Sequence, residues 1–276
     1  FLRVIYSYFL VVYFPHFCFL FFNLLFFRHF RNSPQFGVQL SFSFLGKITQ
    51  KYFFSQIDSF QIPKWRSVNC NIGKKIYQIS NNKSRNVILS TLLFRNVSYL
   101  PALQSFRSFN HDSFYFIFID KANLRKIPSE LKRQIESCNI YFVEIGVLDI
   151  KTYFGIITIR FQIYEKFIWI NKNYFGNIIL VDIFDSVYQG DPFSFNMQKL
   201  YVTTHRIRFK NNKWNFNYLC RIARNCKKFK RLPIINAGLI FGKSRLVYAF
   251  IRIFLNELSP YSIDTLDIPD QSFVNL

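Results

Sequence analysis

Several common functional signatures are missing from this chain of 276 residues. Its five cysteines form no Cys-x-x-Cys pair, which argues against the usual zinc sites. There is also no internal repeat and no glycine-rich phosphate-binding loop. The scattered cysteines are compatible with buried thiols or with one or two long-range disulfides, so they leave the redox compartment undecided. The cysteines are Cys18, Cys70, Cys138, Cys220 and Cys226.

Acidic residues are scarce as well: 15 Asp and Glu stand against 36 Lys and Arg, which gives a net charge of +21. Such a balance favours anionic partners, including nucleotides, nucleic acids and anionic membrane surfaces. The densest basic cluster lies within residues 205–231, and its interleaved aromatic residues could bind nucleic acid. Because no recognised nucleic-acid motif accompanies the cluster, we favour a solvated basic face over a nucleic-acid site.

Methionine is nearly absent, with Met197 as its single occurrence, and the chain begins with Phe1. We therefore interpret the sequence as a fragment, a processed product or a translation extended upstream, and expect both ends to be incomplete. Hydrophobic residues, by contrast, make up 50% of the chain, and 20% of its residues are aromatic. This material is ample for the core of one large or two small domains.

A nearly uninterrupted apolar run occupies residues 4–27, and basic residues follow it at 28–31. Because about 20 apolar residues suffice to cross a bilayer, we expect a transmembrane signal-anchor within residues 1–31. The run is long and lacks a small-residue cleavage site, which disfavours a cleaved signal peptide. The alternative is that residues 1–35 are untranslated sequence read through in frame.

The topology of this anchor stays open in the sequence. Positive charge after the run would place the C-terminal side in the cytosol. Two N-glycosylation acceptors, which begin at Asn82 and Asn96, instead support a lumenal domain in the secretory pathway of the ER and Golgi.

Apolar runs alternate with amphipathic segments from residue 85 to residue 276, after a stem or poorly defined region at 32–84. Strands alternating with helices form βαβ units, so the sequence predicts an α/β fold with a mostly parallel central sheet flanked by helices. The predicted strands are 87–94, 113–120, 139–145, 178–183 and 234–241, and the predicted helices are 128–136, 153–169 and 246–258.

The most informative segment is 178–193, where an apolar run ends in two carboxylates, Asp182 and Asp185. An all-apolar run of this kind is typical of a buried parallel strand, and ligands of open α/β sheets bind at the carboxyl ends of such strands. Two acids at this point can hold a divalent cation, which in turn can hold a diphosphate. The alternative is a pair of solvated aspartates in a turn.

Two later segments give this strand end a context. Asn236-Ala237-Gly238 interrupts an apolar run, and Asp270-Gln271 begins an Asp-Gln-x-x-x-Asn segment. Together with Gln-x-Asp-Pro-Phe at 189–193, they resemble motifs of nucleotide-diphospho-sugar glycosyltransferases. The Asn-Ala-Gly and Asp-Gln-x-x-x-Asn segments also resemble those of glycogenin-like enzymes. The resemblance covers about residues 85–276. It implies a Rossmann-like fold of the GT-A type, and we expect this domain to be truncated at its C-terminus.

The resemblance also implies roles for eight residues. Asp182 and Asp185 would bind Mn²⁺ (or Mg²⁺); Arg160, Gln189, Asn236 and Gly238 would bind the donor; Asp270 and Gln271 would be catalytic. Four of them have structural alternatives: a helix-surface cation for Arg160, a bulge or strand end for Asn236 and Gly238, and a helix N-cap for Asp270.

We therefore expect a metal-dependent glycosyltransferase that moves a hexose from a UDP- or GDP-linked donor to a glycan or protein acceptor. Phe184 stands where the resembled pattern has Arg, and it favours a first alternative, a catalytically inactive or truncated paralogue. A basic nucleic-acid-binding protein that uses residues 205–231 is a second alternative. A membrane protein whose soluble part serves only as a scaffold is a third.

Overall fold

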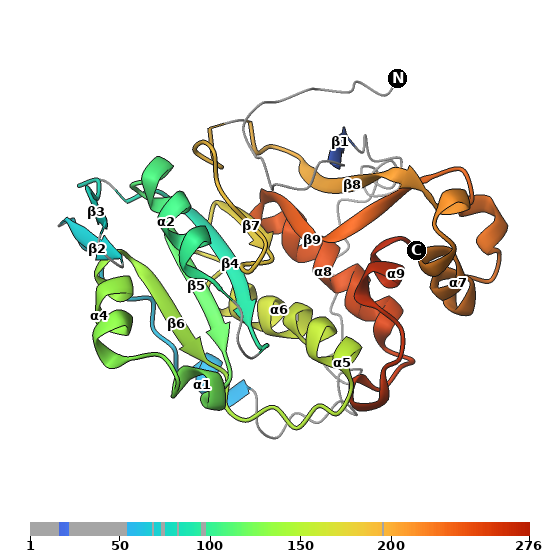
Figure 1. Cartoon of the computed structure of the whole chain (residues 1–276), viewed down its shortest axis with the longest axis horizontal. Coiled ribbons are helices and arrows are strands. Elements are labelled where there is room, and N and C mark those ends of the chain that lie inside the picture. Colours follow the sequence, from blue (N-terminus) through green and yellow to red (C-terminus); the bar gives the residue numbers. More distant parts are fainter. Residues whose placement is uncertain are drawn as a thin grey trace, which may run out of the picture.

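This computed structural model describes residues 54–276 except 68, 73–74, 82, 95–97 and 195, together with the backbone of 17–21. Its centre is a seven-stranded sheet with the order β1-β8-β9-β7-β4-β5-β6, and β2 and β3 form a separate hairpin (Figure 1). The strands are β1 Phe17–Phe21, β2 Cys70–Ile72, β3 Lys75–Tyr77, β4 Asn86–Leu92, β5 Phe114–Ile119, β6 Ile140–Glu144, β7 Asn177–Val181, β8 Leu200–Arg208 and β9 Pro233–Lys243.

Helices connect and cover these strands. The α-helices are α1 Phe54–Asp58, α2 Leu100–Phe109, α3 Lys121–Leu124, α4 Ser129–Ser137, α5 Tyr153–Thr158, α6 Arg160–Ile170, α7 Lys213–Ile222, α8 Ser244–Leu258 and α9 Asp270–Val274. Three 3₁₀ turns add η3 Phe209–Asn211, η4 Cys226–Phe229 and η5 Ile263–Thr265.

Strands β6, β5, β4 and β7 are parallel neighbours, whereas β9 lies antiparallel between β7 and β8. If the four parallel strands are numbered along the chain, their order across the sheet from β6 to β7 is 3-2-1-4. The direction of this order therefore reverses between β4 and β7. The predicted class, an α/β fold with a mostly parallel sheet flanked by helices, is therefore confirmed. The reversal point is where α/β proteins of this kind bind ligands.

Strand β5 is buried along its whole length because helices cover both faces of the sheet. Successive side chains point to opposite faces. On one face Phe118 packs edge-on against Phe167 of α6, with ring centroids 4.9 Å apart. On the other face Tyr115 packs against Phe106 of α2 at 5.3 Å. This two-sided burial explains the nearly continuous apolar runs of the sequence.

The predicted strands and helices all occur, with shifted boundaries. The predicted helix 153–169 is split at Ile159 into α5 and α6, although Ile159 itself keeps helical backbone angles. Strand β8 and helices α2 and α7 were not predicted. Part of the region 32–84 also contributes to the core, because Ile57, Ile72 and Ile79 are fully or almost fully buried.

Two disulfides join separate elements. Cys70 of β2 is bonded to Cys138 at the end of α4, and Cys220 of α7 is bonded to Cys226 of η4. The sequence left open whether the cysteines are buried thiols or form disulfides. These four residues form disulfides. Disulfides of this kind are typical of proteins in oxidising compartments.

Most of the predicted membrane anchor, residues 4–16 and 22–27, lies outside the described residues, as do the acceptors Asn82 and Asn96. Residues 17–21 form strand β1, which pairs antiparallel with β8. Among the described residues, no helix combines the length and the apolar character that crossing a membrane requires.

The two disulfides should differ in their contribution to stability, because they close loops of very different length. Cys70 and Cys138 are 68 residues apart, whereas Cys220 and Cys226 are 6 apart. Loop-closure entropy then predicts a loss of about 4 kcal/mol for Cys70→Ser/Cys138→Ser and about 2 kcal/mol for Cys220→Ser/Cys226→Ser. Urea unfolding of both double variants measures this, and equal losses would contradict it.

Candidate functional site

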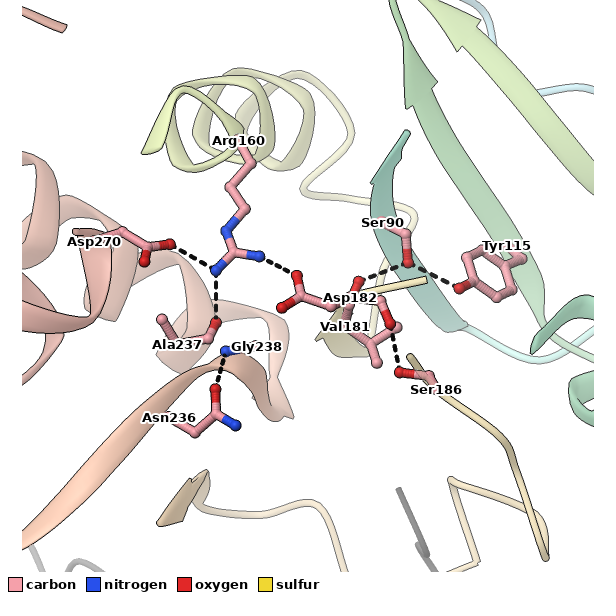
Figure 2. A network of polar contacts seen from close by, with 10 residues as sticks. All are labelled: Ser90, Tyr115, Arg160, Val181, Asp182, Ser186, Asn236, Ala237, Gly238 and Asp270. Atoms are coloured by element: carbon pink, nitrogen blue, oxygen red, sulfur yellow. Dashed lines mark hydrogen bonds and ion pairs between the residues drawn. The ribbon is translucent and has the colours of Figure 1, made fainter. Parts of the chain in front are cut away.

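The site is built at the carboxyl ends of β4 and β7, where the strand order reverses. Ser90 of β4 donates a hydrogen bond to the carbonyl oxygen of Val181 at 2.8 Å, and its Oγ is also 2.8 Å from the hydroxyl of Tyr115 (Figure 2). These buried bonds fix the end of β7. Asp182 follows directly, so its carboxylate starts from a rigid strand end.

Arg160, the first residue of α6, lies between two carboxylates (Figure 2). Its Nη1 donates to Oδ1 of Asp182, and its Nη2 donates to Oδ2 of Asp270 at 2.6 Å and to the carbonyl oxygen of Ala237 at 3.2 Å. Its side chain is only 7% exposed. We call Arg160, Asp182, Asp270 and the backbone of 237–238 the Arg160 cluster. The alternative of a helix-surface cation is wrong, because the two carboxylates draw Arg160 into the interior.

Burial disfavours the charged form of Arg160, but Asp182 and Asp270 outweigh it and raise the pKa of the guanidinium. Arg160 therefore stays charged throughout the accessible pH range. A buried charge is tolerated only when it is paired, and removing one partner of a buried pair typically costs 3–5 kcal/mol. The end of β7, the strand β9 and the helix α9 are thus held together by one side chain.

The Asn-Ala-Gly segment is a bulge in β9, as one of the sequence alternatives proposed. The amide of Asp182 donates to the carbonyl oxygen of Gly238 at 3.0 Å, and the amide of Gly238 donates to Oδ1 of Asn236 at 2.7 Å. A Cβ atom at position 238 would lie 2.5 Å from Oδ2 of Asp182. Glycine is required here because the carboxylate approaches the backbone so closely.

Helix α9 brings the last motif to the cluster. Pro269 is the N-cap of α9, and Asp270 is the first residue of the helix. The N-cap alternative for Asp270 is therefore wrong. Gln271 donates through Nε2 to Oδ1 of Asn215 at 2.7 Å, and its Oε1 is 3.5 Å from Nε2 of His205. Asn275 binds both the amide and the carbonyl of Ile235, at 2.7 and 2.9 Å, and thereby anchors α9 to β9.

Three other polar residues of the segment 178–193 have different surroundings. Asp185 is half-buried, and burial together with the charge of Asp182 raises its pKa from 3.8 to about 6. Gln189 is exposed in the loop after β7 and takes no part in the Arg160 cluster. Asp191 accepts hydrogen bonds from Nδ2 of Asn110 and from the amide of Phe193, both at 3.0 Å, so it holds the loop in place.

The site carries surplus negative charge. Asp182, Asp185 and Asp270 contribute three negative charges against one positive charge on Arg160, which leaves two. Burial raises the pKa of Asp182, and Asp270 adds to the increase while Arg160 opposes it. Such surplus negative charge would attract a cation.

The donor set fits a hard divalent cation only in part. Within the described residues, no group of three or more His, Cys, Asp or Glu side chains is arranged to hold a metal ion. Mg²⁺ and similar ions, however, commonly use one or two carboxylates and complete their shell with water and substrate phosphates. Asp182 and Asp185 could supply such an incomplete oxygen set.

Sequence reasoning missed Ser90, Tyr115, His205 and Asn215, which support the site. For Ser90 a signal exists, because it is a polar residue in the middle of an apolar strand. For Asn215 none exists, since its partner Gln271 lies 56 residues further along the chain.

No protein-family model matches the chain, and a search of the curated proteins found no match.

The raised pKa of Asp185 gives a pH-dependent stability. Because the folded pKa lies above the unfolded one, the folded state binds the proton more tightly, and the free energy of unfolding falls as pH rises from about 4 to about 6. Asp185→Asn should remove much of this dependence. After allowance for partial exposure, it should stabilise the metal-free protein at pH 7 by about 1 kcal/mol, or about 2–4 °C in Tm.

Urea unfolding in EDTA between pH 4 and pH 7 measures this effect. Glu257→Gln on the exposed side of α8 is the matched control and should leave the pH dependence unchanged. A destabilised Asp185→Asn variant at pH 7 would contradict the electrostatic description of the site.

Proposed function

We propose that this chain is a metal-dependent glycosyltransferase of the GT-A type, which transfers a hexose from a UDP- or GDP-linked donor to a glycan or protein acceptor. One observation carries the proposal. Segments of all three motifs meet in the Arg160 cluster, although Ala237 and Asp270 lie 77 and 110 residues from Arg160 in the sequence. Unrelated turn residues would have no reason to converge on one buried guanidinium.

The position of the cluster supports the same proposal. It lies at the reversal of strand order between β4 and β7, at the carboxyl edge of the sheet. Nucleotides bind at this place in doubly wound α/β proteins. The antiparallel strand β9 then brings the Asn-Ala-Gly segment beside Asp182.

The charges of the site are suited to a metal-bound diphosphate rather than to a free one. A free diphosphate would be repelled by the surplus negative charge on Asp182, Asp185 and Asp270. A divalent cation held by Asp182 and Asp185 would remove this repulsion and neutralise the charge that builds on the departing diphosphate. Asp270 and Gln271, on the other side of Arg160, would face the sugar, and Asp270 would orient the acceptor or accept its proton.

The two disulfides support a place in the secretory pathway, because such bonds persist in oxidising compartments. A membrane anchor within residues 1–31 stays a prediction, and the pairing of residues 17–21 with β8 argues against a span that includes them.

An inactive paralogue is the second candidate, and Phe184 favours it. This side chain is 44% exposed between the two aspartates, at the position where the resembled pattern has Arg. A phenyl ring cannot neutralise phosphate charge, so this position would leave that task to the metal.

Thermal melting of the chain with UDP, GDP and their hexose conjugates tests the proposal. A ligand that binds only the folded state at 100 times its Kd adds about 2.7 kcal/mol, which corresponds to a rise in Tm of about 5–10 °C. We expect this rise with Mn²⁺ present, and none in EDTA or in the variant Asp182→Asn/Asp185→Asn.

Glu257→Gln again serves as the control that keeps the full response. A cooperatively melting protein that responds to no nucleotide would favour the inactive paralogue. A metal-independent rise with a single-stranded oligonucleotide, weakened by salt, would favour nucleic-acid binding through residues 205–231.

A further inference from the structure

Six aromatic side chains form a continuous row beside the Arg160 cluster. Distances between successive ring centroids are 6.4 Å for Phe184–Phe94, 5.2 Å for Phe94–Tyr153, 5.6 Å for Tyr153–Phe154 and 6.5 Å for Phe154–Trp214. Tyr218 ends the row, 4.9 Å from Trp214 and 5.7 Å from Phe154. We call these six residues the aromatic row. They come from four segments that are far apart in the sequence.

The aromatic row runs along the ligand-binding edge of the sheet. Phe94 follows β4, Tyr153 begins α5 in the connection after β6, and Phe184 follows β7. These positions are all at the carboxyl ends of parallel strands. The row therefore lies where a substrate of this fold would lie, and not on an arbitrary face.

Both ends of the row adjoin polar groups of the site. Phe184 is the neighbour of Asp185 in the sequence. At the other end, Trp214 precedes Asn215, whose Oδ1 accepts a hydrogen bond from Gln271. Asn215 itself is buried, so this contact supports the Trp214 end from below, and a ligand that covers the row would reach the half-buried carboxylate of Asp185 at the Phe184 end.

The row is also unusually exposed for its size. Tyr153 is 62% exposed, Trp214 50% and Phe184 44%. A contiguous exposed apolar surface of this kind marks a binding site more often than an isolated exposed side chain does. Trp169 gives the contrast: it is 42% exposed, but it stacks on Tyr248 and lies under the ammonium group of Lys172, outside the row.

We propose that the aromatic row binds the acceptor, and that the acceptor is a neutral carbohydrate chain. This inference rests on the proposed function and names the acceptor class of the same site. The C–H face of a sugar ring is apolar and slightly positive, so it packs on the negative face of an aromatic ring. The hydroxyl groups around the sugar ring then require hydrogen-bond partners at the rim, and the half-buried carboxylate of Asp185 beside Phe184 is an acceptor there.

At its Phe184 end the row adjoins negative charge, which argues against a polyanionic occupant there. At the other end, the guanidinium of Arg221, which is paired with Asp267, lies over the Tyr218 ring at 5.6 Å. The surplus negative charge of Asp182, Asp185 and Asp270 lies at the Phe184 end, where it would repel the phosphates of a nucleic acid. A neutral sugar avoids this repulsion. Phe184 then has a function of its own, because the ring that replaces Arg extends the apolar surface up to the carboxylates.

The experiment measures binding of the full chain to a printed array of neutral oligosaccharides, followed by titration with the best-bound oligosaccharide. Trp214→Ala and Tyr153→Ala each remove one exposed ring, and Trp169→Ala is the matched control. We expect at least tenfold weaker binding for the first two variants and unchanged binding for the control. Each variant is also melted with UDP and Mn²⁺, and the nucleotide response should persist in all three.

Three results would overturn the inference. The first is no retained neutral oligosaccharide while UDP still raises Tm. The second is equal weakening by Trp169→Ala. The third is binding of a single-stranded oligonucleotide, in place of sugars, that depends on Trp214. Oligosaccharide binding that requires Trp214, without any nucleotide response, would uphold the aromatic row as a carbohydrate site and reject the proposed transferase.

Discussion

The buried guanidinium of Arg160 is the interaction on which the rest of the site depends. A charge in the interior must be paired, and Asp182, Asp270 and the carbonyl oxygen of Ala237 are its partners. These partners belong to the end of β7, the bulge of β9 and the start of α9, so pairing one charge fixes three segments relative to one another. Gly238 follows from the same constraint, because only a residue without Cβ lets Asp182 approach.

Pairing Arg160 leaves the site with surplus carboxylates in a chain whose net charge is +21. Arg160 neutralises one of the three negative charges, and burial together with the charge of Asp182 raises the pKa of Asp185. Burial and mutual repulsion make this local negative charge costly to retain, as the raised pKa values of Asp182 and Asp185 indicate. A bound cation would offset that cost, and it would convert an edge that repels phosphates into one that binds them.

Much of this arrangement could be predicted from the sequence, because its signals are local. Two-sided burial makes strands such as β5 continuous apolar runs, and a strand end followed by Asp182 and Asp185 marks the ligand-binding edge. The partners of Arg160 could not be predicted, since helical spacing says nothing about carboxylates up to 110 residues away. Strand β8 has mixed burial along its length, and α7 lies beside a basic stretch, so neither carries a clear periodic pattern. The aromatic row escaped notice because aromatic residues are common throughout the chain.

The central claim is that Asp182 and Asp185 form half of a metal site whose other half is the diphosphate of the donor. A crystal soaked with MnCl₂ and UDP, measured for the anomalous signal of manganese, tests it most directly. We expect one strong anomalous peak within about 2–2.5 Å of an oxygen of Asp182 or Asp185, with the diphosphate on its far side. Bound UDP with no manganese beside these two residues, or manganese at another place, would contradict it.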